Sequence, residues 1–343
     1  MKALVLKEYN KFSVDELPVP AYGKDDVLIR VKACAICGSD VHGMDGSTGR
    51  RIPPIVMGHE ASGVIEKIGE NVKAFKPGDR VTFDSTVYCE KCYFCKRGEI
   101  NLCNNRKVLG VSCEDYRFNG AFAEYVSVPQ HILYPLPDKV SFERAAMVEP
   151  LSIAFHAIRR SPVSLNSSAV VVGAGMIGLL IIQLLKINGC GRIIAVDMVQ
   201  EKLDLAIKFG ATSVLRADKV NVPDEVYKLT ENRGADIAFE AVGITPTVQN
   251  AIASLKKGGT LTLVGNLKPS VDLPLQMVVT RQLSLNGSCA SAGEYPECLD
   301  LIASGKVDVD SFISGTATLD EGASWFKRLH EGEPGLMKII LKP

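Results

Sequence analysis

The stretch AVVVGAGMIGLLIIQLLKINGCGRIIAVD, residues 169–197, decides the fold. It opens with a short β-branched run, typical of a strand buried on both faces. Three glycines, an apolar helix and a second strand ending in an acid follow. Gly173 allows a tight turn, Gly175 lets the backbone approach a pyrophosphate, and Gly178 lets the helix pack closely on the sheet. The pattern predicts a dinucleotide-binding unit.

The helix expected from Met176 to Asn188 would direct its free N-terminal N–H groups at the phosphates. The strand from Arg192 to Val196 leads to Asp197, about twenty residues past the last glycine, where an acid suits a ribose 2′-hydroxyl. We therefore expect a nicotinamide cofactor, and NAD rather than NADP. The expected cofactor-binding residues are Gly173, Gly175, Met176, Ile177, Gly178, Asp197, Lys202, Val242 and Val264.

Helix and strand keep alternating beyond Asp197. We expect strands at 213–216, 235–239, 260–264 and 283–287, and helices at 201–209, 223–231 and 247–256. Gly258 and Gly259 should break the last of these helices. With the strands of the glycine-rich stretch, this predicts a six-stranded, doubly wound parallel sheet of the α/β class, which is a Rossmann fold.

The first 150 residues have a different pattern, in which prolines separate short alternating runs. Strands are expected within Asp26–Lys32, at Arg80–Phe83 and at Gly120–Val128, so this segment should be a β barrel or sandwich. From Ser141 the period becomes helical, with an interruption at Pro150, and it leads into the dinucleotide unit. The tail, with helices near 295–304 and 320–330 and a strand at 338–342, should return to the first domain.

Composition restricts the class of protein. The chain has 343 residues, of which 46% are hydrophobic and 23% charged, enough for two domains with cores. Because 39 Lys and Arg balance 39 Asp and Glu, no positive field favours nucleic acid or an anionic membrane. The start resembles neither a signal peptide nor a membrane span. We expect a cytoplasmic protein that acts on a small molecule.

Four cysteines lie close together in the sequence, at Cys89, Cys92, Cys95 and Cys103. This spacing lets a tight turn wrap four thiols around one tetrahedral ion, and zinc is the natural occupant. Such an all-sulfur site leaves no position for water, so its role should be structural. An iron–sulfur cluster and a nucleic-acid-reading zinc module are the alternatives. The neutral net charge and the expected hydride chemistry favour structural zinc.

Cys37, His59 and Glu60 form a second candidate set, which mixes soft and hard ligands. Three ligands leave a fourth position open, and an open zinc lowers the pKa of a bound oxygen, as hydride removal from an alcohol requires. Taken singly, these residues would more often be a buried inert thiol and a satisfied core histidine.

A family resemblance favours the zinc interpretation. Gly58-His59-Glu60, followed by Gly63, Gly69 and Val72, matches G-H-E-x(2)-G-x(5)-G-x(2)-V in full. The chain therefore resembles the zinc-containing alcohol dehydrogenases of the medium-chain dehydrogenase/reductase superfamily. The four-cysteine lobe, GAFAEYV at 120–126 and the glycine fingerprint also occur in family order. The resemblance implies a GroES-like β-barrel catalytic domain at 1–152, completed by 288–343, and a Rossmann NAD-binding domain at 153–287.

Within the superfamily, CGSDVH at 37–42 and EPLS at 149–152 most resemble the sorbitol dehydrogenase branch of polyol dehydrogenases. By this resemblance Cys37, His59 and Glu60 hold a catalytic zinc, with Glu149 beside it as an exchangeable ligand or water partner. Ser39 would hold the reacting hydroxyl, and His42 would take the proton through the nicotinamide ribose and release it to solvent. Asp40 would orient His59.

The resemblance implies a zinc- and NAD-dependent enzyme, with two zinc ions per chain, that oxidises a secondary alcohol of a polyol to a ketone as a homodimer or homotetramer. Sorbitol enzymes carry an Arg-Tyr pair where this chain has GSCAS at 287–291, so the resemblance does not specify the polyol. Threonine dehydrogenase, which usually shows Asp-Pro at Glu149-Pro150, and sugar-alcohol-phosphate dehydrogenases are alternatives. A non-catalytic NAD-binding protein is a further alternative, which the intact Cys37, His59, Glu60 and Ser39 oppose.

Other polar residues are not expected to carry function. His156 should be a satisfied core histidine, and Cys34, Cys113, Cys190, Cys289 and Cys298 lack the spacing of metal ligands. The Arg50-Arg51 pair would suit an anionic substrate, but paired charges in a loop are more often solvated.

Overall fold

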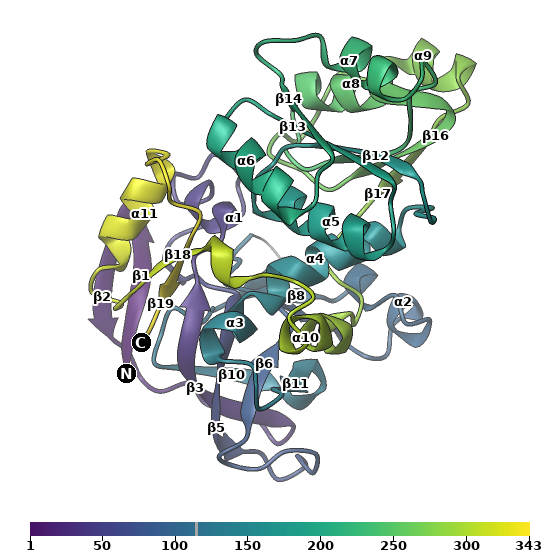
Figure 1. Ribbon diagram of the computed structural model, residues 1–343. Coiled ribbons are helices and arrows are strands. Elements are labelled where there is room, and N and C mark those ends of the chain that lie inside the picture. The colour runs from purple at the N-terminus through teal and green to yellow at the C-terminus, as the bar shows by residue number, and fades with distance from the viewer. Residues whose placement is uncertain (114–115) are drawn as a thin grey trace. The chain divides into compact units, whose positions relative to one another are not determined.

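The computed structural model describes residues 1–113 and 116–343, which form two compact units (Figure 1). Unit 1 comprises Met1–Glu149 and Ser291–Pro343, and unit 2 comprises Pro150–Ala290. The sequence prediction had placed the corresponding boundaries at 152 and 287. Among the described helices, none combines the length and the apolar character that crossing a bilayer requires.

Unit 2 is a six-stranded sheet in which every neighbouring pair is parallel. Its strands, in spatial order, are β14 (Ser213–Arg216), β13 (Arg192–Asp197), β12 (Ser168–Val172), β15 (Ala235–Glu240), β16 (Leu255–Leu263) and β17 (Ser284–Gly287). The helices are α4 (Val148–Arg159, which begins in unit 1), α5 (Met176–Ile187), α6 (Gln200–Phe209), α7 (Val222–Leu229), α8 (Thr245–Ser254) and α9 (Leu275–Thr280). This strand order confirms the predicted doubly wound Rossmann sheet.

Two boundaries differ from the sequence prediction. Pro150 does not interrupt a helix: α3 (Phe142–Ala146) ends before Met147, and Pro150 lies in the first turn of α4. Proline is tolerated there because the N–H groups of a first turn have no partner within the helix. The second difference is β16, which begins at Leu255 and continues through Gly258 and Gly259. The register with β15 shifts here, since Leu255 pairs with Ala235 and Thr260 with Ile237, and Gly258 donates its N–H to the Arg281 carbonyl.

Unit 1 is built mainly of β structure. A seven-stranded sheet contains β3 (Asp26–Ala35), β5 (Glu60–Ile68), β6 (Arg80–Phe83), β10 (Tyr125–Pro129), β11 (Leu133–Pro135), β18 (Ile313–Ala317) and β19 (Lys338–Leu341). Two three-stranded sheets contain β1 (Lys2–Glu8), β2 (Lys11–Glu16) and β4 (Ile55–Val56), and β7 (Thr86–Val87), β8 (Lys107–Leu109) and β9 (Arg117–Phe118). The other helices are α1 (Gly38–Val41), α2 (Tyr93–Lys96), α10 (Tyr295–Ala303) and α11 (Gly322–His330).

The strand expected at Gly120–Val128 is shorter than predicted, because β10 begins only at Tyr125. Gly120 and Phe122 instead donate their backbone N–H groups to Val56 and Met57, which lie near the expected metal ligands. Gly120 packs so closely here that a Cβ would lie 2.2 Å from the Gly58 carbonyl oxygen. This segment thus supports the loop before β5.

The C-terminal tail is part of the barrel. β19 pairs antiparallel with β3 and parallel with β18, so the tail extends the sheet that β3 and β5 form at the other end of the chain. Phe326 and Ile339 are fully buried in one core with Leu4 and Phe122. The tail therefore supplies both backbone partners and core side chains to unit 1.

Asp236 connects two central strands of unit 2. Its carboxylate accepts hydrogen bonds from the Ser168 N–H and hydroxyl, both at 2.7 Å, and an ion pair from Lys256 at 2.6 Å. Partial burial would raise the pKa of Asp236, but the bonds from Lys256 and Ser168 outweigh it and lower that pKa to about 2.

We expect Asp236→Asn to reduce the free energy of unfolding at pH 7 by about 1 kcal/mol, after allowance for solvent screening. The stabilisation by Asp236 is present above the ordinary aspartate pKa of 3.8 and is lost as the pH falls toward about 2. Urea unfolding of both proteins between pH 7 and pH 3 measures this difference. A difference that grew as the pH fell below 4 would contradict the assignment.

Candidate metal and cofactor sites

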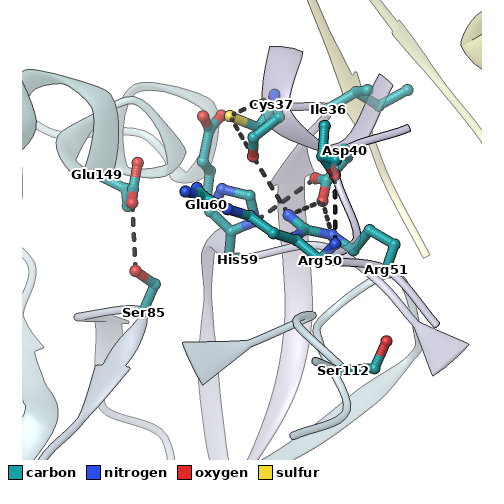
Figure 2. Close-up of polar contacts among 12 residues, drawn as sticks. Ile36, Cys37, Asp40, Arg50, Arg51, His59, Glu60, Ser85, Ser112 and Glu149 are labelled. Carbon is teal, nitrogen blue, oxygen red and sulfur yellow. Dashed lines mark hydrogen bonds and ion pairs between the residues drawn. The ribbon is translucent and has the colours of Figure 1, made fainter. Parts of the chain in front are cut away.

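Cys37, His59 and Glu60 come together in unit 1, where their ligand atoms all lie within 4.8 Å of one another (Figure 2). Cys37 follows β3 and caps the short helix α1, while Glu60 opens β5. Because Ala35 pairs with Glu60 across β3 and β5, the end of one strand and the start of the other meet at this place. Strand pairing therefore assembles ligands that are separated in the sequence.

The donor set suits a divalent metal such as zinc. Burial, and then the Glu60 carboxylate, raise the pKa of Cys37 to about 12, and a bound cation would reverse that effect. His59 Nδ1 lies 3.5 Å from Asp40 Oδ2, which leaves the other ring nitrogen to face a metal. Neither of these two buried atoms has a hydrogen-bond partner within the described residues. Each is therefore the polar atom that faces the other, and this contact orients the ring. The predicted partner of His59, Asp40, is thus in place.

Asp40 has a second partner that the sequence prediction missed. Arg51 donates to Asp40 Oδ1 from Nε at 3.1 Å and from Nη2 at 2.7 Å, and its side chain is only 2% exposed. Figure 2 shows the guanidinium beside the Asp40 carboxylate. Arg51 is therefore not the solvated loop charge that its sequence context suggested.

Lys338 was also missed. From β19, its ammonium donates to both carboxylate oxygens of Glu60, at 3.0 and 2.7 Å, and to the Ile36 carbonyl at 3.1 Å. Burial alone would lower the pKa of Lys338, but Glu60 and Cys37 raise it. An ammonium has three N–H donors, so each has a partner here. Glu60 is consequently a candidate ligand that is already paired with a buried cation.

Glu149 lies outside the group of three. Its carboxylate accepts a hydrogen bond from Ser85 at 3.2 Å, and Figure 2 shows this pair apart from Cys37. Burial raises the pKa of Glu149 to about 8; Glu60 and Cys37 act in the same direction and His59 opposes them. The charges of Cys37, His59 and Glu60 therefore affect the pKa of the Glu149 carboxyl group, although Glu149 does not belong to their cluster.

Ser39 and His42 lie at the ends of the same short helix. Ser39 donates its hydroxyl hydrogen toward Cys37 Sγ at 3.3 Å and accepts from Arg51 Nη2 at 3.2 Å. His42 caps α1, and its side chain is exposed. The hydroxyl thus lies next to a metal ligand, and the imidazole reaches solvent.

The four cysteines of the second set also come together, with their sulfur atoms within 4.8 Å of one another. Backbone N–H groups of Cys89 and Asn105 donate to Cys103 Sγ, each at 3.3 Å. Hydrogen bonding from the Asn105 amide, at 3.5 Å, is the largest of the effects that lower the pKa of Cys89 to about 6. Thiolate-stabilising N–H groups around a closed sulfur set suit a tetrahedral metal.

The glycine turn in unit 2 has the shape that a dinucleotide requires. Gly173 has φ +98°, and a Cβ there would lie 2.6 Å from Val242 Cγ2. A Cβ on Gly178 would lie 1.8 Å from the Gly173 carbonyl oxygen, so only glycine allows this approach. A Cβ on Gly175 would meet nothing within 4 Å, which is the open side a pyrophosphate needs. The N-terminus of α5, with Met176 and Ile177, begins there without a side-chain cap.

Asp197, at the end of β13, accepts N–H groups from Ala174 at 2.8 Å, Met198 at 2.8 Å and Val199 at 3.0 Å. These bonds hold a carboxylate beside the glycine turn. Val242 and Val264 follow β15 and β16 at the same edge of the sheet, and Lys202 lies in the first turn of α6. The expected cofactor residues therefore gather at the carboxyl ends of the strands, where ligands bind in this fold.

Glu240 is a further residue that the sequence prediction missed. Its Oε1 accepts from the N–H groups of Val242 and Gly243 and from the Thr247 hydroxyl, at 3.0, 2.8 and 2.7 Å. The fully buried carboxylate thereby fixes the loop against which Gly173 packs. Its position directly after a predicted buried strand was the available signal.

Comparison with known proteins identifies the family of both domains. Residues 23–138 match the model of the alcohol dehydrogenase GroES-like domain, and residues 177–304 match that of the zinc-binding dehydrogenase. Sorbitol dehydrogenase from Bacillus subtilis is 33% identical over 348 aligned positions, which cover 100% of this chain and 97% of that protein. A probable D-xylulose reductase A from Aspergillus fumigatus is 36% identical, covering 98% and 96%.

Solved structures show the same arrangement. Galactitol-1-phosphate dehydrogenase from Escherichia coli has a TM-score of 0.92 at 27% identity, with 100% of each chain covered. 2R,3R-butanediol dehydrogenase from Bacillus subtilis has a TM-score of 0.89 at 30% identity, covering 100% of this chain and 99% of that one. The same score, identity and coverages apply to a zinc-binding dehydrogenase from Sinorhizobium meliloti that was solved with NADP.

The chain therefore belongs to the zinc-binding dehydrogenases of the medium-chain dehydrogenase/reductase superfamily. It is an oxidoreductase of the alcohol dehydrogenase type that uses zinc and a nicotinamide cofactor. The alternative of a non-catalytic nucleotide-binding protein is thus set aside. The GroES-like barrel and the Rossmann sheet predicted from the sequence are confirmed.

Proposed function

We propose that the protein oxidises a secondary hydroxyl of a polyol or sugar alcohol to a ketone, with NAD as the hydride acceptor. The observation that carries this proposal is the polar surrounding of the three-ligand group. The Ser39 hydroxyl lies 3.3 Å from Cys37 Sγ, and the carboxyl groups of Glu60 and Glu149 lie nearby. Such groups offer partners to neighbouring hydroxyls rather than a dry slot for an alkyl chain.

The residues would divide the chemistry as follows. Zinc would supply Lewis acidity toward the substrate oxygen, while the nicotinamide would accept the hydride. Ser39 would bind the reacting hydroxyl and take its proton, and His42 would pass that proton to solvent. Glu149 would bind a second hydroxyl or exchange with Glu60. Its hydrogen bond from Ser85 holds it ready for either role.

One observation favours a neutral polyol over threonine or a phosphorylated sugar alcohol. Arg51 and Lys338 are the buried cations next to the ligand group, and each is engaged by a carboxylate, Asp40 or Glu60. An anionic substrate would need a cation that is available to it. The names of the relatives include a neutral polyol and a sugar-alcohol phosphate, so the comparison of these substrates is a decisive test.

Polyols with adjacent hydroxyls should exceed ethanol in kcat/KM by a large factor, on the order of 10⁴ where a buried polar group would be left unpaired. A panel of sorbitol, xylitol, galactitol, their phosphates, threonine and ethanol, followed by NADH absorbance, measures this. Glu149→Ala should lower turnover without unfolding the protein. A panel in which threonine clearly outperformed every polyol would overturn the substrate class and leave the zinc assignment untouched.

We also propose two zinc ions per chain, one in each ligand set. Cys92→Ser should lower thermal stability, because a closed thiolate site contributes folding energy. Cys37→Ser should leave a folded protein with one zinc fewer and almost no turnover, because the open site contributes mainly Lewis acidity. Metal analysis and thermal unfolding of the three proteins distinguish these outcomes. A single zinc in active wild-type protein would refute the two-site proposal.

NAD should be preferred over NADP, because Asp197 would repel a 2′-phosphate. Arg216, its register partner on β14, is held by Asp218 through two bonds of 2.8 Å and so is not set to bind that phosphate. Asp197→Ser should reduce the ratio of kcat/KM for NAD to that for NADP by at least about tenfold, which corresponds to about 1.4 kcal/mol. An unchanged ratio would show that Asp197 does not set cofactor choice.

For the assembly, we propose a homodimer or homotetramer that forms through β17 and acts in the cytoplasm on a small-molecule substrate, without nucleic acid or membrane partners. β17 is an edge strand of the six-stranded sheet, and the neighbouring helix α9 exposes Leu275 and Val279. An edge strand next to exposed apolar side chains is suited to pairing with a second copy. The balanced net charge supports the absence of nucleic acid and membrane partners.

A further inference from the structure

Arg51 is among the largest fully buried side chains of the protein, although it follows the exposed Arg50 in the link between α1 and β4. Burying a guanidinium costs several kcal/mol unless its donors have well-placed acceptors. Its contacts therefore show what this position provides. They involve two residues that bear on the candidate catalytic site.

The first contact is Asp40. Two guanidinium nitrogens of Arg51 donate to the same oxygen, Oδ1, at 3.1 and 2.7 Å. The other oxygen, Oδ2, then faces His59 Nδ1 at 3.5 Å. Because both donors hold the same oxygen, Oδ1, they leave Oδ2 to face the imidazole. Arg51 thus sets the orientation of the His59 ring indirectly, through Asp40.

The second contact is Ser39. Arg51 Nη2 donates to Ser39 Oγ at 3.2 Å, and that hydroxyl is itself 3.3 Å from Cys37 Sγ. A hydroxyl has one hydrogen and two acceptor positions. With one acceptor position filled by Arg51, Ser39 retains one to receive a substrate proton and must give its own hydrogen onward. The same guanidinium therefore sets the direction in which Ser39 can transfer a proton.

We propose that Arg51 is a positioning residue whose single guanidinium orients the His59 imidazole through Asp40 and the proton-transferring hydroxyl through Ser39. The proposal extends the role given to Ser39 under the proposed function and rests on it for the second part. Its first part concerns metal binding alone. Different substitutions of Arg51 should consequently affect zinc affinity, through Asp40, and proton transfer, through Ser39.

Arg51→Lys tests the contact with Ser39. Lysine keeps the charge that balances Asp40, but it has a point charge in place of a planar fork and cannot hold both partners in the same way. We expect kcat with the best polyol to fall about tenfold or more, with a smaller change in KM, while zinc content stays at the wild-type value. In the Ser39→Ala background, Arg51→Lys should change kcat less than about twofold, because the interaction it disturbs is already gone. Equal losses in both backgrounds, or no loss in wild type, would overturn the role through Ser39.

Arg51→Met tests the contact with Asp40 by zinc affinity, which chelator competition measures without any turnover. Loss of a partner behind a metal ligand typically costs 10- to 100-fold in affinity, and we expect a weakening of about that size. Because Arg51→Met leaves Asp40 as an unpaired buried charge, the charge-balanced double variant Asp40→Asn/Arg51→Met is measured beside it. It should fold and still bind zinc at least about tenfold more weakly than wild type. Wild-type zinc affinity in either protein would overturn the role through Asp40.

Arg144→Met is the matched control, because Arg144 also donates two hydrogen bonds to an aspartate, Asp310, in the same unit, but its side chain is 41% exposed and its carboxylate partner is not Asp40. It should retain wild-type zinc affinity and kcat, and a loss like that of Arg51→Met would overturn the specificity of the effect. If wild type turned over no polyol with NAD, the proposed function would fail, while the zinc-affinity measurements would still decide the role of Arg51 at His59.

Discussion

A buried ion pair, Lys338 with Glu60, is the interaction on which unit 1 depends. The ammonium lies on the last strand of the chain, and the carboxylate opens the strand that carries a metal ligand, 278 residues away in sequence. Breaking a buried pair leaves an uncompensated charge and costs about 3–5 kcal/mol. The tail therefore does more than complete the barrel through β19. Its Lys338 also holds the Glu60 carboxylate in place and balances the carboxylate charge. The strand that closes the barrel, β19, thus also positions a candidate metal ligand, Glu60.

The same principle of paired burial extends around the ligand group. Glu60 is balanced by Lys338 and Asp40 by Arg51, and all four residues are at most 2% exposed. Burial raises the pKa of Glu149 to about 8, so this carboxyl group adds little charge near neutral pH unless a cation lies beside it. What remains is the Cys37 thiol, whose raised pKa reflects burial without a cation of its own. A divalent ion therefore completes the charge balance of this site and does not disturb the pairs around it.

Sequence reasoning succeeded where local pattern determines structure. The glycine fingerprint, the alternation of helix and strand and the C-x-x-C spacing depend on neighbours in the chain, and β14 was predicted with its observed bounds, Ser213–Arg216. Sequence reasoning failed where a tertiary contact determines whether a side chain is buried or exposed. Lys338 meets Glu60 only because β19 pairs with β3 and β3 pairs with β5. Arg51 meets Asp40 only because the link between α1 and β4 folds back onto α1. Likewise, Gly258 lies within β16 and donates its N–H to the carbonyl of Arg281, which follows α9.

The fold alone does not determine whether a dehydrogenase of this family prefers NAD or NADP. A dehydrogenase with a TM-score of 0.89 to this chain was solved with NADP, so a similar fold does not by itself exclude the 2′-phosphate. The difference must lie in charges at the carboxyl ends of the strands. Three backbone N–H groups, from Ala174, Met198 and Val199, donate to the Asp197 carboxylate and fix its position. Arg216, the nearest cation on the adjacent strand, is engaged by Asp218. At the edge where we propose that the adenosine ribose binds, hydrogen bonds therefore fix one carboxylate, and a second carboxylate engages the neighbouring arginine.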